Sequence, residues 1–193
     1  MTGELIRLTD LKNWAYCPRV VYYHRVMPGA GTETYKMSAG LGAQALVEGL
    51  ELRRTLERYG LQGAERRYGV WLASEKVGLS GRADLVLVGG KACSVVDYKL
   101  TGGDPGENHR MQLHGYALML EAEWRVTVEQ AFLYRIPDDR VFRIAIDDQG
   151  REAVWGAVAG IREMVAEQLC PEGTEVRGRC RDCEFANFCG DVW

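Results

Sequence analysis

The sequence predicts a mixed α/β fold, a β-sheet flanked by helices, from three observations. First, residues 66–100 are rich in β-branched and aromatic side chains and contain a hairpin signal. Second, a helical segment separates these strands from two further extended segments. Third, strict alternation of strand and helix is missing, which argues against a doubly wound sheet. With 193 residues, 47% of them apolar, the chain is long enough for one domain with its own core.

The first sixty residues are predicted to be helical with interruptions. Thr9 is a suitable N-cap for a short helix ending near Trp14, and Pro18 fits the first turn of a second helix. Between residues 38 and 59 apolar side chains recur at helical spacing, and Gly60 stands where a left-handed residue would end that helix.

The central and later parts of the chain are predicted to supply the strands. Extended stretches occupy residues 66–74, 83–88 and 92–100, and a Gly-Gly-Lys turn between the last two indicates an antiparallel hairpin. Two more extended stretches, residues 128–137 and 140–146, meet across an Asp-Asp turn.

Two longer helices are expected around these later strands. Asp104, Pro105 and Glu107 resemble a capping box with a first-turn proline and predict a helix to about residue 121. A final helix over residues 148–169 is predicted to bury one apolar stripe. The stripe consists of Val154, Val158, Ile161, Val165 and Leu169.

Composition and charge exclude several classes of protein. No apolar run approaches the roughly 18 residues that a membrane-spanning helix requires, and the N-terminus lacks the basic-then-apolar layout of a secretion signal. The 24 basic and 27 acidic side chains give a net charge of −3, unlike proteins held to nucleic acid mainly by phosphate neutralisation. We therefore expect a soluble, cytoplasmic protein with only local contacts to nucleic acid.

Two carboxylates and a lysine on the predicted hairpin form a candidate metal site. Asp84 near the start of one strand and Asp97 near the end of the next can be level, and Lys99 shares a strand face with Asp97. Carboxylate oxygens, with the backbone carbonyl of Tyr98, suit Mg²⁺ or Mn²⁺. Such an ion activates water and polarises a phosphate, and Lys99 is placed to assist the attacking water. A solvated Asp-Lys pair without catalysis would give the same pattern.

The helix after the hairpin carries further candidates. Gln112 and Tyr116 are four residues apart, so they face one way and are candidates to position a phosphate or base. His109 lies three residues before Gln112 and is a candidate DNA contact. Arg177, Arg179 and Arg181 form a local positive run near the C-terminus, typical of phosphate contacts and equally of a solvated tail.

The cysteines are the anomalous part of the composition. Cys180, Cys183 and Cys189 crowd the last fourteen residues, and Cys17 lies beside Pro18 near the other end. Four thiolates suit either zinc or an iron-sulfur cluster, and spacing does not separate the two. Such a centre would join the two chain ends. Cys93 and Cys170 are expected to be ordinary core or surface residues, with Cys170 the substitute ligand if Cys17 is not one.

These motifs resemble those of a known family. The runs GRAD (81–84), DYK (97–99) and QLHGY (112–116) are similar to the GxxD, (D/E)xK and QxxxY motifs of RecB-like nucleases in the PD-(D/E)xK superfamily. With the one-plus-three cysteine set, the chain resembles the CRISPR-associated Cas-four nucleases, whose RecB-like core is closed by an iron-sulfur cluster. The resemblance extends from about residue 17 to residue 189.

The resemblance implies a fold, an activity and partners. It implies a restriction-endonuclease-like domain over residues 1–193, with residues 1–36 and 170–193 forming a lobe around a [4Fe–4S] cluster on Cys17, Cys180, Cys183 and Cys189. The implied activity is metal-dependent exonuclease action on single-stranded ends of prespacer DNA during CRISPR adaptation. The implied partner is the spacer integrase, and the implied roles are metal binding for Asp84 and Asp97 and catalysis for Lys99, Gln112 and Tyr116.

The chain departs from the family pattern at two positions. Gln44 stands where members commonly carry a metal-binding histidine, and Glu48 one turn later is a candidate replacement. Asp97 stands where glutamate is more usual. Three alternatives therefore remain open: a non-catalytic DNA-binding subunit of the adaptation complex, a RecB-like repair nuclease, and a zinc-stapled α/β protein without nuclease activity.

Overall fold

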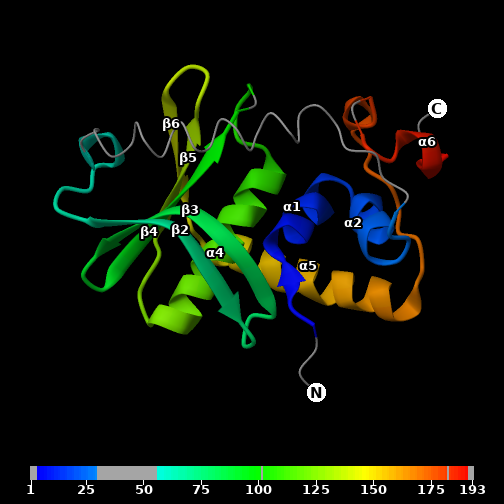
Figure 1. Ribbon diagram of the computed structural model, residues 1–193, viewed down its shortest axis with the longest axis horizontal. Coiled ribbons are helices and arrows are strands. Elements are labelled where there is room, and N and C mark those ends of the chain that lie inside the picture. The colour runs from blue at the N-terminus through cyan, green and yellow to red at the C-terminus, as the bar shows by residue number, and fades with distance from the viewer. Residues whose placement is uncertain (1–3, 30–55, 101, 182, 191–193) are drawn as a thin grey trace.

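A computed structural model describes residues 4–29, 56–100, 102–181 and 183–190, and its centre is a mixed β-sheet (Figure 1). Within the described residues the sheet has strands β1 to β6 in the order β1-β3-β4-β5-β6, and β2 pairs with the free edge of β3. The strands are β1 (Ile6–Arg7), β2 (Glu65–Ser74), β3 (Leu79–Gly89), β4 (Ala92–Lys99), β5 (Gln130–Arg135) and β6 (Arg140–Ala145). The predicted mixed α/β class is confirmed.

The strand directions follow from the connections. Tight turns join β2 to β3, β3 to β4 and β5 to β6, so these pairs are antiparallel, and the predicted Gly-Gly-Lys turn contains Gly90 at a φ of 69°. A long crossover through helix α4 (Glu107–Trp124) makes β4 and β5 parallel. The short β1, which the sequence pattern did not predict, pairs in parallel with the start of β3.

Helices cover the sheet and extend it at one end. The other helices are α1 (Leu8–Tyr16), α2 (Pro18–Arg25), α5 (Asp148–Glu167) and the short α6 (Ala186–Cys189), with 3₁₀ turns η1 (Leu56–Tyr59) and η2 (Arg177–Arg179). Figure 1 shows α1 and α2 beside the C-terminal segment, with α5 running beneath them. Helices α1 and α2 and the described C-terminal segment are therefore neighbours at the end of the molecule away from the β5–β6 hairpin. No helix among the described residues is long and apolar enough to cross a membrane.

Alternation along the strands sends side chains into two apolar clusters. On one face, Val86 and Val95 pack in the cluster that contains α1, α4 and α5. On the other, Leu85 and Val96 pack with Phe132 and the η1 turn. Both faces of the β3–β4 pair are therefore covered by apolar side chains, and charged residues occur where the pair ends.

Several predicted boundaries need correction. Helix α4 begins at Glu107, not at residue 104, because the imidazole of His109 closes its first turn by accepting from the Gly106 amide at 3.2 Å. Asp104 is exposed and lies instead 3.8 Å from Arg135.

The apolar stripe of α5 is also narrower than predicted. Val154, Val158 and Ile161 are buried as expected, but Val165 is 39% exposed and Leu169 is 64% exposed. Met164 takes the next core position, since the helical period places it above Ile161.

The prediction of a helix over residues 38–59 lies mostly outside the described residues, as do Gln44 and Glu48. Its last residues, Leu56–Tyr59, form the η1 turn. Gly60 follows at a φ of 66°, as predicted for a left-handed residue at a helix end.

Candidate active site and cysteine pocket

The β3–β4 hairpin brings the two predicted carboxylates to adjacent strands. The ladder pairs Leu85 with Val96, so Asp84 and Asp97 are the next residues outward on the two strands. Beyond this pair the side chain of Asp84 replaces the ladder, because its Oδ2 accepts from the backbone N–H of Tyr98 at 2.8 Å. Asp84 is thereby fixed at the point where the two strands separate.

Lys99 faces the same site from β4. Its Nζ lies 2.6 Å from Oδ2 of Asp97, a short ion pair between a half-buried lysine and an aspartate that is only 3% exposed. The two residues are two positions apart on one strand, so alternation places both side chains on one face. The structure therefore brings Asp84, Asp97 and Lys99 together as the hairpin pattern predicted.

Helix α4 supplies a second wall of this site. Gln112 and Tyr116 are both buried, and among the described residues Oε1 of Gln112 has no hydrogen-bond partner. The hydroxyl of Tyr116 donates to the backbone carbonyl of Arg82 at 2.5 Å. Burial, reinforced by the charges of Asp97 and Asp84, raises the pKa of Tyr116 well above its usual value, so the phenol stays protonated. Tyr116 therefore holds β3 two residues before Asp84.

His109 also lies near the carboxylates. Burial and the neighbouring charge of Lys99 lower its pKa to about 4. The neutral imidazole accepts from the Gly106 amide and completes the first turn of α4. One ring nitrogen is thus committed to the helix cap, in a position close to the predicted site.

The oxygen donors of this site suit a divalent cation that keeps much of its own water. Two carboxylates on adjacent strands are a typical protein share of the coordination of Mg²⁺ or Mn²⁺. The buried amide oxygen of Gln112 lacks a partner within the described residues, which is an acceptor left over near the same carboxylates. Across the described ranges, no group of three or more His, Cys, Asp or Glu side chains is placed to hold an ion by itself.

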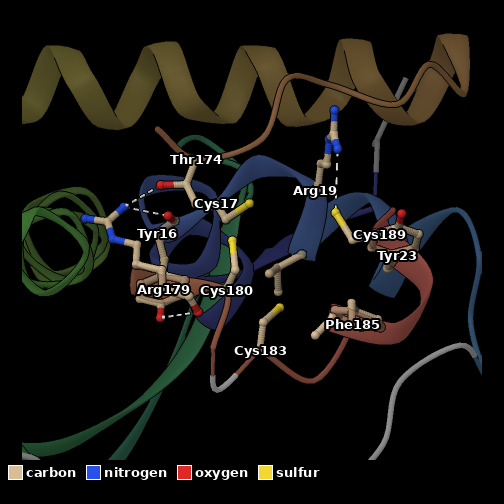
Figure 2. A pocket seen from close by; sticks show the side chains of 12 residues that line it. Tyr16, Cys17, Arg19, Tyr23, Thr174, Arg179, Cys180, Cys183, Phe185 and Cys189 are labelled. Atoms are coloured by element: carbon tan, nitrogen blue, oxygen red, sulfur yellow. Dashed lines mark hydrogen bonds between the residues drawn. The ribbon is translucent and has the colours of Figure 1, made fainter. Parts of the chain in front are cut away.

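The four predicted cysteines line one pocket at the other end of the molecule. Cys17 comes from the junction of α1 and α2, and Cys180, Cys183 and Cys189 come from the C-terminal segment. Figure 2 shows their sulfur atoms around a common space, with Cys189 facing Arg19. Apolar side chains close the pocket, among them Val20 and Phe185. The pocket therefore places four cysteine thiols against an apolar wall.

Polar contacts bind the two chain ends together around this pocket. The guanidinium of Arg179 donates to the carbonyl of Tyr16 at 2.6 Å and lies over the Tyr16 ring. Arg19 donates to the carbonyl of Pro171 at 2.9 Å and to the sulfur of Cys189 at 3.5 Å. Arg179, a candidate phosphate contact, therefore uses its Nη1 inside the protein, where it joins α1 to the C-terminal segment.

The remaining cysteines behave as the sequence indicated. Cys93 is buried in the large apolar cluster, and burial raises the pKa of its thiol. Cys170 is exposed and does not line the pocket. The cysteines that line the pocket are therefore Cys17 and the three C-terminal ones, and Cys170 lies outside its lining, within electrostatic reach of Cys17 and Cys189.

Sequence reasoning missed Lys12 on α1. Burial, followed by the neighbouring Lys99, lowers its pKa to about 8, and the charges of Asp97 and Asp84 act in the opposite direction. All three charged side chains of the site are thus its neighbours. The available signal was its spacing: it lies one helical turn after Leu8, whose side chain is buried against the same elements.

Comparisons with known proteins identify the family of this chain. The profile of the PD-(D/E)XK nuclease superfamily matches residues 19–190. The CRISPR-associated exonuclease Cas4 of Francisella tularensis subsp. novicida (strain U112) is 28% identical over 181 residues, which are 94% of this chain and 91% of that protein.

Two solved structures share the fold. The crystal structure of SSO0001 has a TM-score of 0.58 and 22% identity, covering 100% of this chain and 89% of that one. The alkaline exonuclease LHK-Exo from Laribacter hongkongensis has a TM-score of 0.53 and 12% identity, covering 86% of this chain and 90% of that one. The fold is therefore of the restriction-endonuclease type.

Proposed function

Because the chain belongs to the PD-(D/E)XK nuclease superfamily, we propose that it is a metal-dependent DNA exonuclease in which Asp84, Asp97 and Lys99 carry out phosphodiester hydrolysis. The observation that carries the proposal is the meeting of these side chains at the open end of the β3–β4 pair, with Asp97 and Lys99 2.6 Å apart. The likeness to a CRISPR-associated exonuclease supports the exonuclease mode.

Asp84, Asp97 and the carbonyl of Tyr98 are the proposed holders of Mg²⁺ or Mn²⁺. When bound, such an ion supplies Lewis acidity at the phosphate and lowers the pKa of a water. The backbone N–H of Tyr98 already orients the Asp84 carboxylate. Because Asp97 is buried, little water screens the attraction between its carboxylate and a bound cation.

The protein's own side chains divide the remaining work. Lys99 orients the attacking water or a phosphoryl oxygen, since its ammonium is already fixed beside Asp97. Gln112 presents a buried amide to the DNA strand near the scissile phosphate. Tyr116 acts through β3, because its hydroxyl holds the Arg82 carbonyl and so the strand that carries Asp84.

We further propose that Cys17, Cys180, Cys183 and Cys189 hold a [4Fe–4S] cluster. A single zinc ion needs its four sulfurs about 2.3 Å from one point. The four cysteines line the wall of one pocket. The cluster is proposed over zinc because the one-plus-three cysteine set resembles that of the CRISPR-associated nucleases.

The proposed domain organisation follows from the same pocket. Residues 1–193 form a single nuclease domain, and residues 1–36 with 170–193 form the cluster lobe. Contacts that support it join residues more than 150 positions apart, such as Arg19 with Pro171 and Tyr16 with Arg179.

The proposed biological setting is CRISPR adaptation. The chain would trim single-stranded ends of prespacer DNA together with the spacer integrase, a role suggested by the similarity to Cas4 over most of both chains. Trimming of overhangs to a defined length only when purified integrase is present would support this setting. Equal trimming with and without integrase would favour a repair nuclease.

Substitution of Asp84 and Lys99 tests the nuclease proposal. Asp84→Ala and Lys99→Ala are expected to abolish Mn²⁺-dependent release of nucleotides from end-labelled single-stranded DNA while circular dichroism stays unchanged. Full residual activity in either variant would refute the assignment. Binding without cleavage by the unmodified protein, in both Mg²⁺ and Mn²⁺, would favour a non-catalytic DNA-binding subunit.

The cluster proposal is tested independently of cleavage. Protein purified without oxygen is expected to be brown, with a broad absorption near 400 nm as a rough guide for thiolate-bound clusters, and to contain about four iron atoms per chain. A colourless protein containing one zinc would overturn the cluster and leave the carboxylate site untouched.

A further inference from the structure

We propose that Lys12 is a substrate-binding residue whose ammonium binds a phosphate of the DNA strand beside Asp84 and Asp97. This inference deepens the proposed nuclease function and rests on it. It arises from the position of helix α1, which packs against β3 and α4 through Leu8 and places Lys12 in the wall of a groove.

Two glycines clamp α1 against the elements that carry the site. A Cβ atom on Gly81 would lie 2.9 Å from Cβ of Leu8, and one on Gly115 would lie 2.5 Å from Cδ1 of the same leucine. Gly81 is three residues before Asp84, and Gly115 directly precedes Tyr116. Contacts this close need residues without side chains, so the sequence places α1 against β3 and α4 beside the site.

Lys12 extends from this clamped face toward the carboxylates. It lies one helical turn after Leu8, and residues four apart in a helix are neighbours on one face. Lys99 and His109 both have electrostatic interactions with Lys12, as do Asp97 and Asp84. The Lys12 ammonium is therefore part of the same small group of charges, although it comes from a different element.

Neither carboxylate serves Lys12 as an ion-pair partner. Asp97 is paired with Lys99 at 2.6 Å, and Asp84 accepts from the Tyr98 amide. Over the described residues, no salt bridge of Lys12 is formed. A half-buried ammonium without a carboxylate is costly, and an anionic ligand would remove that cost.

Lys12 also lines a groove whose other walls come from α2, α5 and Glu184. Its acidic side chains have partners of their own: Asp10 and Glu4 share Arg25, at 2.7 and 2.8 Å, and Glu184 lies 3.2 Å from His24. Lys12 and Arg7 are cations of this groove that form no ion pair within the described residues. A phosphate group bound in the groove can therefore pair with the ammonium of Lys12.

The two lysines then have separate tasks. Lys99 is held by Asp97 and acts at the reacting centre, whereas Lys12 binds a phosphate and fixes the position of the strand. A residue of this kind contributes to DNA binding through counterion release, so its loss lowers the salt dependence of affinity. A purely structural lysine in the same place would leave that salt dependence unchanged.

The test compares Lys12→Gln and Lys12→Arg with Lys91→Gln, a matched control at an exposed position in the β3–β4 turn. Binding of single-stranded DNA is measured in Ca²⁺ over a range of salt concentrations, together with cleavage in Mn²⁺. Lys12→Gln is expected to weaken binding about tenfold, to reduce the slope of log affinity against log salt by about 0.7, and to lower kcat/KM. Lys12→Arg retains most of the slope, and Lys91→Gln behaves as the unmodified protein.

The outcomes separate the two levels of inference. If Lys12→Gln keeps the slope and kcat/KM of the unmodified protein while Asp84→Ala loses cleavage, the nuclease function stands and the Lys12 proposal is wrong. If the unmodified protein binds DNA without cutting it, the nuclease proposal fails, and the salt slopes still decide the role of Lys12. Thermal unfolding of each variant verifies that a weaker affinity is not caused by misfolding.

Discussion

The carboxylate site and the cysteine pocket differ in how the chain assembles them. Asp84, Asp97 and Lys99 lie within one hairpin, and Tyr116 follows on the next helix. The cysteine pocket instead joins Cys17 to Cys189, across almost the whole chain. The first site is held by a strand ladder and charged hydrogen bonds, whereas the second is formed by short helices and turns.

The two sites also differ in how much apolar packing holds their side chains in place. The carboxylate site sits on elements with large buried faces, so it is formed by the fold itself. Only a small apolar cluster, including Val20, Tyr23 and Phe185, supports the cysteine pocket. We therefore expect the pocket to depend on the group it holds, and the carboxylate site to be independent of its metal. Four predictions test this contrast, in order of decreasing effect.

The largest effect is expected for Asp84→Asn. An asparagine oxygen can still accept from the Tyr98 amide, so the fold is kept while the negative charge is lost. Cleavage in Mn²⁺ should fall by about a thousandfold, corresponding to about 4 kcal/mol of transition-state stabilisation. Iron content and the melting temperature should stay close to those of the unmodified protein. A large loss of stability would show that the carboxylate site is not self-supporting.

Cys17→Ser should change iron content and stability more than Asp84→Asn does. Removing one proposed ligand should release the metal centre and cost about 2–4 kcal/mol of unfolding free energy, as for loss of a long-range cross-link. Denaturant unfolding with iron analysis measures both effects, and Cys170→Ser, at an exposed position outside the pocket, is the matched control. Equal stability of both variants would contradict the dependence of the pocket on its ligand.

Gly115→Ala tests the helix that links the two regions. The added methyl would lie 2.5 Å from Leu8 and 2.8 Å from Leu11, so α1 must shift away from α4. We expect a loss of about 1–3 kcal/mol in unfolding free energy, together with lower cleavage activity. Gly156→Ala is the control, because a Cβ there meets no atom within 4 Å and alanine favours a helix. Equal effects of the two substitutions would contradict close packing of α1.

The smallest effect concerns pH. The pKa of His109 is about 4 in the folded protein and near its ordinary value when unfolded, so between these values the unfolded chain binds more protons. The unfolding free energy should therefore fall as pH drops from about 6.5 to about 4. This fall should be on the order of 1 kcal/mol after allowance for partial exposure, and His109→Asn should not show it. The unfolding free energy of both proteins is measured against pH without divalent ions. Parallel curves would show that His109 does not cause the fall.

Much of the hairpin site could be predicted from local spacing. Residues two apart on a strand share a face, which was enough to join Asp97 with Lys99, and the Gly-Gly-Lys turn was enough to bring Asp84 to the neighbouring strand. Gln112 and Tyr116, four residues apart, are both buried on α4, where every residue from Met111 to Leu120 is buried. The carboxylate site is therefore largely a property of sequence separation.

Other side chains could form hydrogen bonds with several partners, and sequence spacing does not show which partner each one binds. The imidazole of His109 replaced Asp104 as the cap of α4, and Arg179 turned inward to the carbonyl of Tyr16. The hydroxyl of Tyr116, a candidate to position a phosphate or base, donates to the Arg82 carbonyl and so holds β3. In each case the side chain had several possible partners, and the packed fold decided which was nearest.

The amino-acid sequence alone determined the mixed sheet, the carboxylate hairpin and the set of four cysteines, because these follow from strand alternation, turn chemistry and residue type. Only the tertiary structure decided that the cysteines surround one pocket and that α1 carries Lys12 to the carboxylates. Those arrangements join segments far apart in the chain, and the close fit of Leu8 against Gly81 and Gly115 fixes the position of α1 against β3 and α4. Such a fit depends on the shapes of packed surfaces, which no local pattern contains.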